Sequence, residues 1–236
     1  MPSAGVVIIG NEILSGKFAD ENSPWLIGRL RELGCDLLRI AVVADTEREI
    51  ADEVARQSSS FDWVITTGGV GPTHDDVTFA GVAAAFGLRL HHHPELVAVL
   101  REKLGERCND AALRMAEVPE QSALWWDGGV VYPLIVCRNV CIFPGVPSLL
   151  RLKFDKVAHR FAGVPVSTAR LVTGRSEPEI ADTLTEAARR WPGVAIGSYP
   201  RLDERPIVVI ITLESRDSAA LAAAEAFLRA AGLGLS

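Results

Sequence analysis

The stretch Thr67-Gly68-Gly69-Val70-Gly71-Pro72-Thr73-His74-Asp75-Asp76, called the glycine loop below, directly follows a run of mostly apolar residues. That run, residues 61–66, predicts a strand buried on both faces. Glycines let a backbone turn tightly and approach a ligand closely. A helix is expected over residues 75–86, closed by Gly87, and its free N–H groups favour an anion. Because ligands of open α/β sheets bind beyond the carboxyl ends of the strands, the loop predicts an anion site, most simply for phosphate.

Strand-like and helix-like stretches alternate on both sides of the glycine loop. Strands are expected at residues 5–9 and 36–43, with helices at residues 22–33 and from Thr46 onward. Three such alternations predict a three-layer αβα fold with a mostly parallel sheet. The remaining elements expected in this part are helices at 94–104, 110–117 and 148–161, and strands at 124–126, 131–137 and 139–143, the last two forming a hairpin at residues 138–139.

A change of rhythm after Gly163-Val164-Pro165 predicts a domain boundary, with an α/β domain at residues 1–164 and a small α+β module at 165–236. The module has the order β-α-β-β-α. Its strands are expected at 169–172, 194–199 and 206–213, its helices at 177–190 and 218–231, and a polar turn at 202–205.

Composition excludes several classes of partner. The net charge is -6 and the pI is about 5.4, which argues against nucleic acid and acidic membrane surfaces as partners. No apolar stretch is long enough to span a membrane and no signal peptide is evident, so a cytoplasmic protein is expected. The four cysteines form no zinc pattern and are expected to be reduced thiols.

Asp75 and Asp76 add a second requirement to the loop. Carboxylates repel a neighbouring phosphate unless a cation lies between them, and hard divalent cations use carboxylate and phosphate oxygens together. Such an ion can also activate water. The alternative is that one aspartate caps the following helix and the other favours its dipole. The sequence leaves both interpretations open.

Other strand ends are expected at the same edge of the sheet. Asn11 and Glu12 follow the first strand and are candidates for ligand or metal contact, or for an ordinary turn with a solvated glutamate. Asp45 follows the second strand and stays open, whereas Thr46 fits a helix cap, with Glu49 completing a capping box. The turn at residues 143–148 is either a ligand wall beside the glycine loop or a plain connector, with Ser148 as a helix cap.

Histidines and lysines refine this picture. His91-His92-His93 lacks the spacing of histidine metal sites and fits an exposed polar turn, in which only His91 and His93 share a face. His74 lies inside the loop and is a candidate donor to a phosphate. No lysine followed by serine or threonine closes the loop, which excludes a P-loop nucleotide site.

Together these motifs resemble a known family. Residues 10–16, 67–78 and 143–147 are similar to the MoaB/MogA-like molybdopterin-binding domain of the CinA type, and residues 173–177 and 196–200 carry the likeness into the C-terminal module. The stretch at residues 132–140 looks closest to the corresponding domain of two-domain FAD synthases. For those domains the resemblance implies metal-dependent hydrolysis of FAD, and for CinA-type domains hydrolysis of ADP-ribose.

The leading hypothesis is therefore a divalent-metal-dependent pyrophosphatase on ADP-containing nucleotides, with Mg²⁺, Mn²⁺ or Co²⁺ as cofactor. The alternatives are a non-catalytic module that binds molybdopterin or a nucleotide, and a purely structural oligomeric domain. A homo-oligomer is expected. The assigned residues are Asp75, Asp76 and Glu12 for catalysis and metal binding; Thr67, Gly68, Gly69, Val70, Gly71, Thr73 and Asn11 for phosphate; and Gly10, Pro144, Gly145 and Ser148 for the pocket wall.

Overall fold

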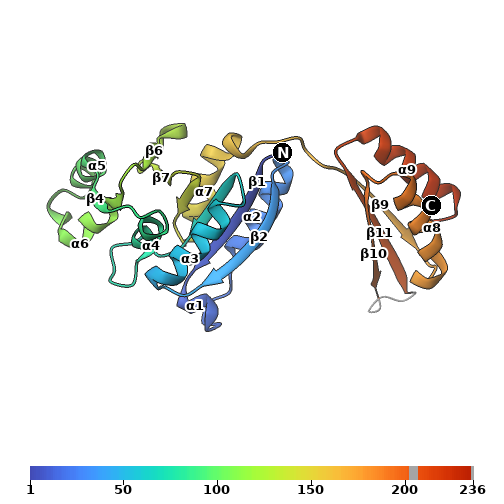
Figure 1. Ribbon diagram of the computed structural model, residues 1–236, viewed down its shortest axis with the longest axis horizontal. Helices are drawn as coiled ribbons and strands as arrows, with labels where there is room; N and C mark the ends of the chain where they lie inside the picture. The colour runs from blue at the N-terminus through green and yellow to red at the C-terminus, as the bar shows by residue number, and fades with distance from the viewer. Residues whose placement is uncertain (202–206, 235–236) are drawn as a thin grey trace. The chain divides into compact units, whose positions relative to one another are not determined.

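The computed structural model describes residues 1–201 and 207–234. The chain folds into two compact units (Figure 1). The first unit comprises residues 1–163 and the second begins at residue 164. Each unit has its own sheet and its own apolar core.

The first unit is built on a six-stranded sheet in the order β2-β1-β3-β8-β7-β6. Four neighbouring strands, β2, β1, β3 and β8, run parallel, and β7 runs antiparallel to both of its neighbours, β8 and β6. The mostly parallel sheet predicted from the sequence is confirmed. The strand bounds are β1 Ser3–Ile9, β2 Asp36–Val43, β3 Trp63–Thr67, β6 Ala123–Trp125, β7 Leu134–Cys137 and β8 Val140–Phe143.

Helices cover both faces of this sheet, because alternate side chains of each strand point to opposite sides. Val6 and Ile8 of β1 pack in one core with helices α2 (Asn22–Glu32) and α7 (Pro147–Val157). Val7 and Ile9 pack in a second core with α3 (Glu47–Ser58), α4 (Thr78–Ala85) and α5 (Pro94–Leu104). The three-layer αβα arrangement is confirmed.

Glycines end the predicted helices where the sequence indicates. Gly34 has φ 73° and follows α2, and Gly87 has φ 64° and follows α4. Both positive φ values are accessible to glycine at little cost. The hairpin between β7 and β8 turns at Arg138, as predicted, with φ 54°.

Some elements differ from the sequence prediction. Helix α4 begins at Thr78, not at residue 75, so neither Asp75 nor Asp76 caps it; the N-cap is Val77. The helix expected at 110–117 is only α6, Asp110–Leu113, followed by a 3₁₀ turn and a strand. The elements not predicted are α1 Asn11–Leu14, β4 Leu90–His92 and β5 Glu117–Pro119, the last two forming an antiparallel ribbon, and 3₁₀ turns at Gly105–Arg107, Arg114–Ala116, Asp127–Gly129 and Ala158–Phe161.

The second unit is a three-stranded antiparallel sheet in the order β10-β11-β9. Leu171, Ile211 and Leu213 of the sheet pack with apolar residues of both helices. The predicted order β-α-β-β-α is confirmed, while the predicted turn at residues 202–205 lies outside the described residues. The bounds are β9 Ser167–Thr173, α8 Glu177–Arg190, β10 Ala195–Arg201, β11 Val208–Ser215 and α9 Ser218–Ala230.

Two further observations concern the part of the chain that the structure describes. No helix there is long and apolar enough to cross a membrane. All four cysteines are free, and three of them, Cys35, Cys137 and Cys141, are buried.

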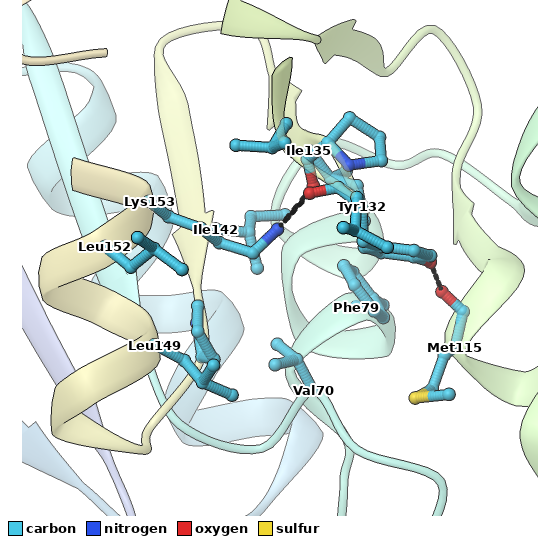
Figure 2. Close-up of a pocket in the computed structure, with 13 residues that line it drawn as sticks. Val70, Phe79, Met115, Tyr132, Ile135, Ile142, Leu149, Leu152 and Lys153 are labelled. Atoms are coloured by element: carbon cyan, nitrogen blue, oxygen red, sulfur yellow. Dashed lines mark hydrogen bonds between the residues drawn. The ribbon is translucent and has the colours of Figure 1, made fainter. Parts of the chain in front are cut away.

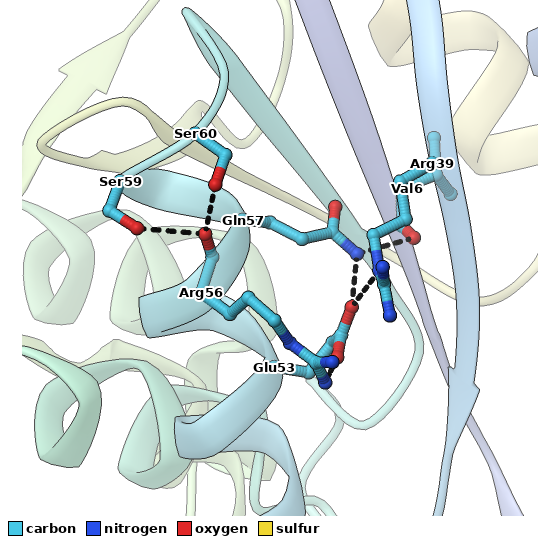
Figure 3. Close-up of polar contacts among 7 residues, drawn as sticks. All are labelled: Val6, Arg39, Glu53, Arg56, Gln57, Ser59 and Ser60. Carbon is cyan, nitrogen blue, oxygen red and sulfur yellow. Dashed lines mark hydrogen bonds and ion pairs between the residues drawn. The ribbon is translucent and has the colours of Figure 1, made fainter.

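A buried carboxylate joins α3 to the sheet (Figure 3). Glu53 is 3% exposed, and its Oε1 accepts hydrogen bonds from Arg39 Nε at 2.9 Å and Gln57 Nε2 at 2.7 Å. Its Oε2 accepts from Arg56, and Gln57 also donates to the backbone oxygen of Val6. Buried charges of this kind are stable only while their partners remain.

We expect Glu53→Ala to lower the free energy of unfolding by about 2 kcal/mol. The substitution removes the acceptor of the buried Gln57 side-chain amide and the carboxylate that pairs with Arg39 and Arg56. Asp52→Ala on the same helix is the control, because Asp52 is exposed and lies 3.8 Å from Arg48; it should change stability by less than about 0.5 kcal/mol. Urea unfolding measures both. Equal losses would contradict a structural role for Glu53.

Candidate functional site

The glycine loop is held tightly against the end of the sheet. Gly68 has φ 107°, and a Cβ placed there would lie 2.0 Å from the backbone oxygen of Ile9 in β1. Thr78, fully buried at the start of α4, donates through Oγ1 to the Gly68 oxygen at 2.8 Å and through its N–H to the Gly69 oxygen at 3.0 Å. The loop needs glycine for both conformation and space.

Three successive backbone amides of the loop are free. The N–H groups of Gly69, Val70 and Gly71 donate to no acceptor among the described residues. These residues are half-buried and line a cleft. Successive unpaired amides in a turn can form an anion-binding concavity, so the loop backbone has donors that a phosphate could use.

The loop amides, and not the helix, provide these donors. Helix α4 begins three residues later than predicted, and the N–H of its first residue, Thr78, donates to the Gly69 backbone oxygen. None of the residues of α4 lines the cleft. The expectation that the helix N-terminus would face the anion is therefore wrong. The prediction of an anion site at this loop now depends only on the free backbone amides of Gly69, Val70 and Gly71.

Asn22 of α2 joins the loop to the neighbouring turn. Its Nδ2 donates to Thr67 Oγ1 at 3.0 Å and to the Gly145 backbone oxygen at 2.8 Å, and Thr67 Oγ1 donates to the Pro144 oxygen at 3.0 Å. Because a carbonyl oxygen only accepts, Nδ2 must be the atom that faces Gly145. Asn22 Oδ1 is buried and receives no hydrogen bond from the described groups.

The turn at residues 143–148 lies beside the glycine loop, as the interpretation of the turn as a ligand wall expected. A Cβ on Gly145 would lie 3.1 Å from Gly68 Cα. Pro144 and Gly145 line the cleft, whereas Ser148 is exposed and does not. Ser148 also does not cap α7, because Val146 is the N-cap and Pro147 is the first helical residue; proline suits that position.

Asp75 and Asp76 converge on one hydroxyl. Thr73 Oγ1 lies 2.5 Å from Asp75 Oδ1 and 2.6 Å from Asp76 Oδ2, and Thr73 N–H donates to Asp76 Oδ2 at 2.7 Å. The Thr73 hydroxyl and the backbone N–H of Asp75 hold the pKa of Asp75 below its usual range. A hydroxyl carries one hydrogen and can satisfy only one of the two carboxylates. This concentration of oxygen atoms fits a hard cation.

The loop, the turn and the first strand end surround a cleft of about 1040 Å³. Of the predicted site residues, Gly10, Thr73 and Ser148 do not line it, although Thr73 contacts both aspartates. The predicted residues that line the cleft are Asn11, Glu12, Thr67, Gly68, Gly69, Val70, Gly71, Asp75, Asp76, Pro144 and Gly145.

The cleft is strongly acidic. Lys17 is the one basic residue among its described lining residues, and sequence reasoning missed both Lys17 and Asn22. The six acidic lining residues are Glu12, Asp20, Glu21, Asp45, Asp75 and Asp76. Added positive charge would therefore strengthen the binding of a diphosphate in this cleft.

Asp45 and Thr46 follow β2, and neither was assigned to the site from the sequence. Both stabilise the local structure. Asp45 Oδ2 accepts from the Asn11 N–H at 2.7 Å, which joins the ends of β1 and β2. Thr46 caps α3 by accepting from Glu49 N–H, but Glu49 reaches Ala44 and not Thr46. The predicted cap is confirmed, and the reciprocal half of the capping box is wrong.

The histidines supply no preformed metal site. His74 is 94% exposed, with Nδ1 3.9 Å from Asp75 Oδ1. His91 and His93 share a face, with ring centroids 5.8 Å apart, but they are half-buried beside strand β5, which corrects the predicted exposed turn. No three histidine, cysteine or acidic side chains are grouped for metal binding within residues 1–201 and 207–234. Any ion at Asp75 and Asp76 would thus need ligand oxygens as well, as Mg²⁺ commonly does.

Two known families match successive parts of the chain. Residues 5–164 match the family described as probable molybdopterin binding domain, and residues 165–232 match the FAD synthase middle domain. A probable FAD synthase of Caenorhabditis briggsae is 34% identical over 255 residues, covering 96% of this chain and 49% of that protein. The chain thus spans about half the length of that relative.

Two other relatives match over most of their length. A protein of Archaeoglobus fulgidus is 34% identical over 212 residues, covering 90% of each chain. The crystal structure of the protein CinA, of unknown function, from Thermoplasma acidophilum has a TM-score of 0.62 at 28% identity and covers 67% of this chain and 97% of that one. The resemblance inferred from the strand-end motifs is confirmed, and the chain belongs to the family of probable molybdopterin-binding domains, with CinA and FAD synthase among its relatives.

Proposed function

We propose that this protein is a divalent-metal-dependent pyrophosphatase acting on ADP-containing nucleotides such as ADP-ribose or FAD. The observation that carries the proposal is the pairing of three free amides with two converging carboxylates in one cleft. The amides suit the phosphates, and the carboxylates suit a cation that would neutralise them. A site that only held a phosphate would gain nothing from six acidic residues around it.

Each group has a role in the proposed reaction. The N–H groups of Gly69, Val70 and Gly71 bind the diphosphate and stabilise negative charge as it develops. Asp75 and Asp76 would hold Mg²⁺, Mn²⁺ or Co²⁺ together with substrate oxygens, and Glu12, which lines the same cleft, would add negative charge that favours the ion. When bound, such an ion lowers the pKa of a water molecule and neutralises phosphate charge. Water adds to one phosphorus and the P–O–P bond breaks, giving AMP and either ribose 5-phosphate or FMN.

The relatives support a nucleotide ligand. The matching worm protein is named as a probable FAD synthase, and that name describes FAD as a product of the whole protein. This chain corresponds to about half of that protein, so the synthase activity of the whole protein does not carry over to it. FAD and ADP-ribose share the adenosine diphosphate group that the loop would hold.

A second candidate is a non-catalytic module that binds molybdopterin or a nucleotide. The absence of a three-residue metal group from the described part of the chain favours it, as does the description of the matching family. A module of this kind needs the amides for a phosphate but has no use for Asp75 and Asp76.

One assay separates the two candidates. Purified protein is incubated with ADP-ribose or FAD and with Mg²⁺, Mn²⁺ or Co²⁺, and the products are separated by chromatography. The proposal predicts AMP from at least one substrate with at least one metal and none in EDTA. Binding of ligand without AMP under any condition would support the non-catalytic module.

A further inference from the structure

A second, apolar pocket opens beside the acidic cleft (Figure 2). Its volume is about 330 Å³, within the range of small-ligand pockets. Phe79, Ile135 and Ile142 are buried lining residues. Leu149 and Leu152 of α7 line it too and are 47% and 57% exposed, so the pocket is accessible from solvent. Exposed apolar side chains around a concave site are typical of ligand binding.

The apolar pocket and the acidic cleft share a wall. Four residues line both: Val70, Met115, Pro144 and Leu149. Val70 lies inside the glycine loop, between two glycines whose amides are free. A ligand with its phosphates on those amides would therefore have the apolar pocket directly beside it.

The few polar groups of the apolar pocket are largely engaged by the pocket's own backbone. The Tyr132 hydroxyl donates to the Met115 backbone oxygen, and Lys153 Nζ donates to the backbone oxygens of Tyr132 at 2.6 Å and Pro133 at 2.8 Å. In these hydrogen bonds both the donor and the acceptor belong to residues that line the pocket (Figure 2). Burial raises the pKa of Tyr132 and lowers the pKa of Lys153 to about 8. The pocket thus offers little to the polar edge of a ring.

We propose that the apolar pocket binds the apolar edge of a flat fused ring carried by the ligand whose diphosphate lies at the glycine loop, which makes FAD a better ligand than ADP-ribose. The inference rests on the proposed function for the position of the diphosphate. The dimethylbenzene edge of the flavin ring needs no hydrogen bonds. The polar edges of a pterin or adenine would lose theirs on entering this pocket. Phe79, Tyr132 and Met115 also suit contact with an aromatic ring.

Binding in EDTA tests the inference without requiring turnover. Dissociation constants for FAD and for ADP-ribose are measured by calorimetry on the wild type, Leu152→Gln and Leu38→Gln. Leu38 is the matched control, because it is 62% exposed on β2 and lines neither site. Glutamine is a good helix former, so α7 should persist in the Leu152 variant.

We expect the wild type to bind FAD about tenfold more tightly than ADP-ribose, since apolar contact of a few methyl groups has effects of this order. Leu152→Gln should weaken FAD binding severalfold and leave ADP-ribose binding unchanged, and Leu38→Gln should change neither. Equal affinities for the two ligands in the wild type, or equal effects of Leu152→Gln on both, would overturn the inference.

The two proposals fail in different ways. Selective, Leu152-dependent binding of FAD without AMP formation under any metal would support the ring pocket and reject the pyrophosphatase. Cleavage of both nucleotides, with no preference and no effect of Leu152→Gln, would support the pyrophosphatase and reject the ring pocket.

Discussion

Replacing Asp76 with asparagine should lower the rate of metal-dependent cleavage by at least about 100-fold, as loss of a group that stabilises transition-state charge does. Asp76 Oδ2 accepts from the Thr73 N–H at 2.7 Å and lies 2.6 Å from the Thr73 hydroxyl oxygen. The asparagine oxygen can accept the same bonds, so the loop should keep its shape while losing one negative charge. The loss should therefore appear in kcat with saturating metal, and FAD affinity in EDTA should not fall.

Asp155→Asn is the matched control for this variant. Asp155 lies in α7, pairs with Arg29 at 3.2 Å and does not line the cleft. Steady-state AMP release should be unchanged by it. If Asp76→Asn retained wild-type activity at every metal concentration, Asp76 would not be a ligand of the ion, and the alternative of a charge that merely shapes the loop would hold.

Gly68→Ala should lower the free energy of unfolding of the first unit by about 3 kcal/mol or more and abolish nucleotide binding. The new Cβ would lie 2.0 Å from the Ile9 backbone oxygen, and the residue would keep a φ of 107° that non-glycine residues rarely adopt. Neither strand end can move away easily, because β1 lies between β2 and β3 in the sheet.

Gly87→Ala separates the two contributions. Gly87 has φ 64°, and nothing lies within 4 Å of a Cβ placed there, so only the conformational cost of about 1 kcal/mol applies. Chemical denaturation followed by circular dichroism measures both variants. Similar losses for the two would show that the contact with Ile9 has no energetic weight and that the loop can withdraw from the strand.

The sequence predicted the sheet and most helices because their signals are local. Apolar runs such as residues 5–9 and the stops at Gly34 and Gly87 depend on neighbours in the chain, and these elements are confirmed. The β4–β5 ribbon was missed because His91 pairs with Val118, far along the chain, and no turn signal joins them. Pairings of that kind follow from tertiary packing and not from local preference.

The candidate site shows the same division. Glycines and acidic residues beside strand ends were visible as motifs, and eleven of the assigned residues line the cleft. The start of α4 was misplaced because Asp75 and Asp76 resemble capping residues, whereas Thr73 binds both carboxylates and keeps them in the loop. Asn22 looked like an ordinary first residue of a helix, and only the fold brings it to Thr67 and Gly145.

The central claim is that water cleaves a diphosphate at the glycine loop with the help of a metal ion. The most direct measurement is mass spectrometry of the products formed from FAD in ¹⁸O-labelled water with Mn²⁺, by the wild type and by Asp76→Asn. The account predicts equimolar AMP and FMN, one ¹⁸O atom for each bond cleaved, and almost no product from the variant. Intact FAD with Mn²⁺, Mg²⁺ and Co²⁺ alike, or undiminished cleavage by Asp76→Asn, would contradict it.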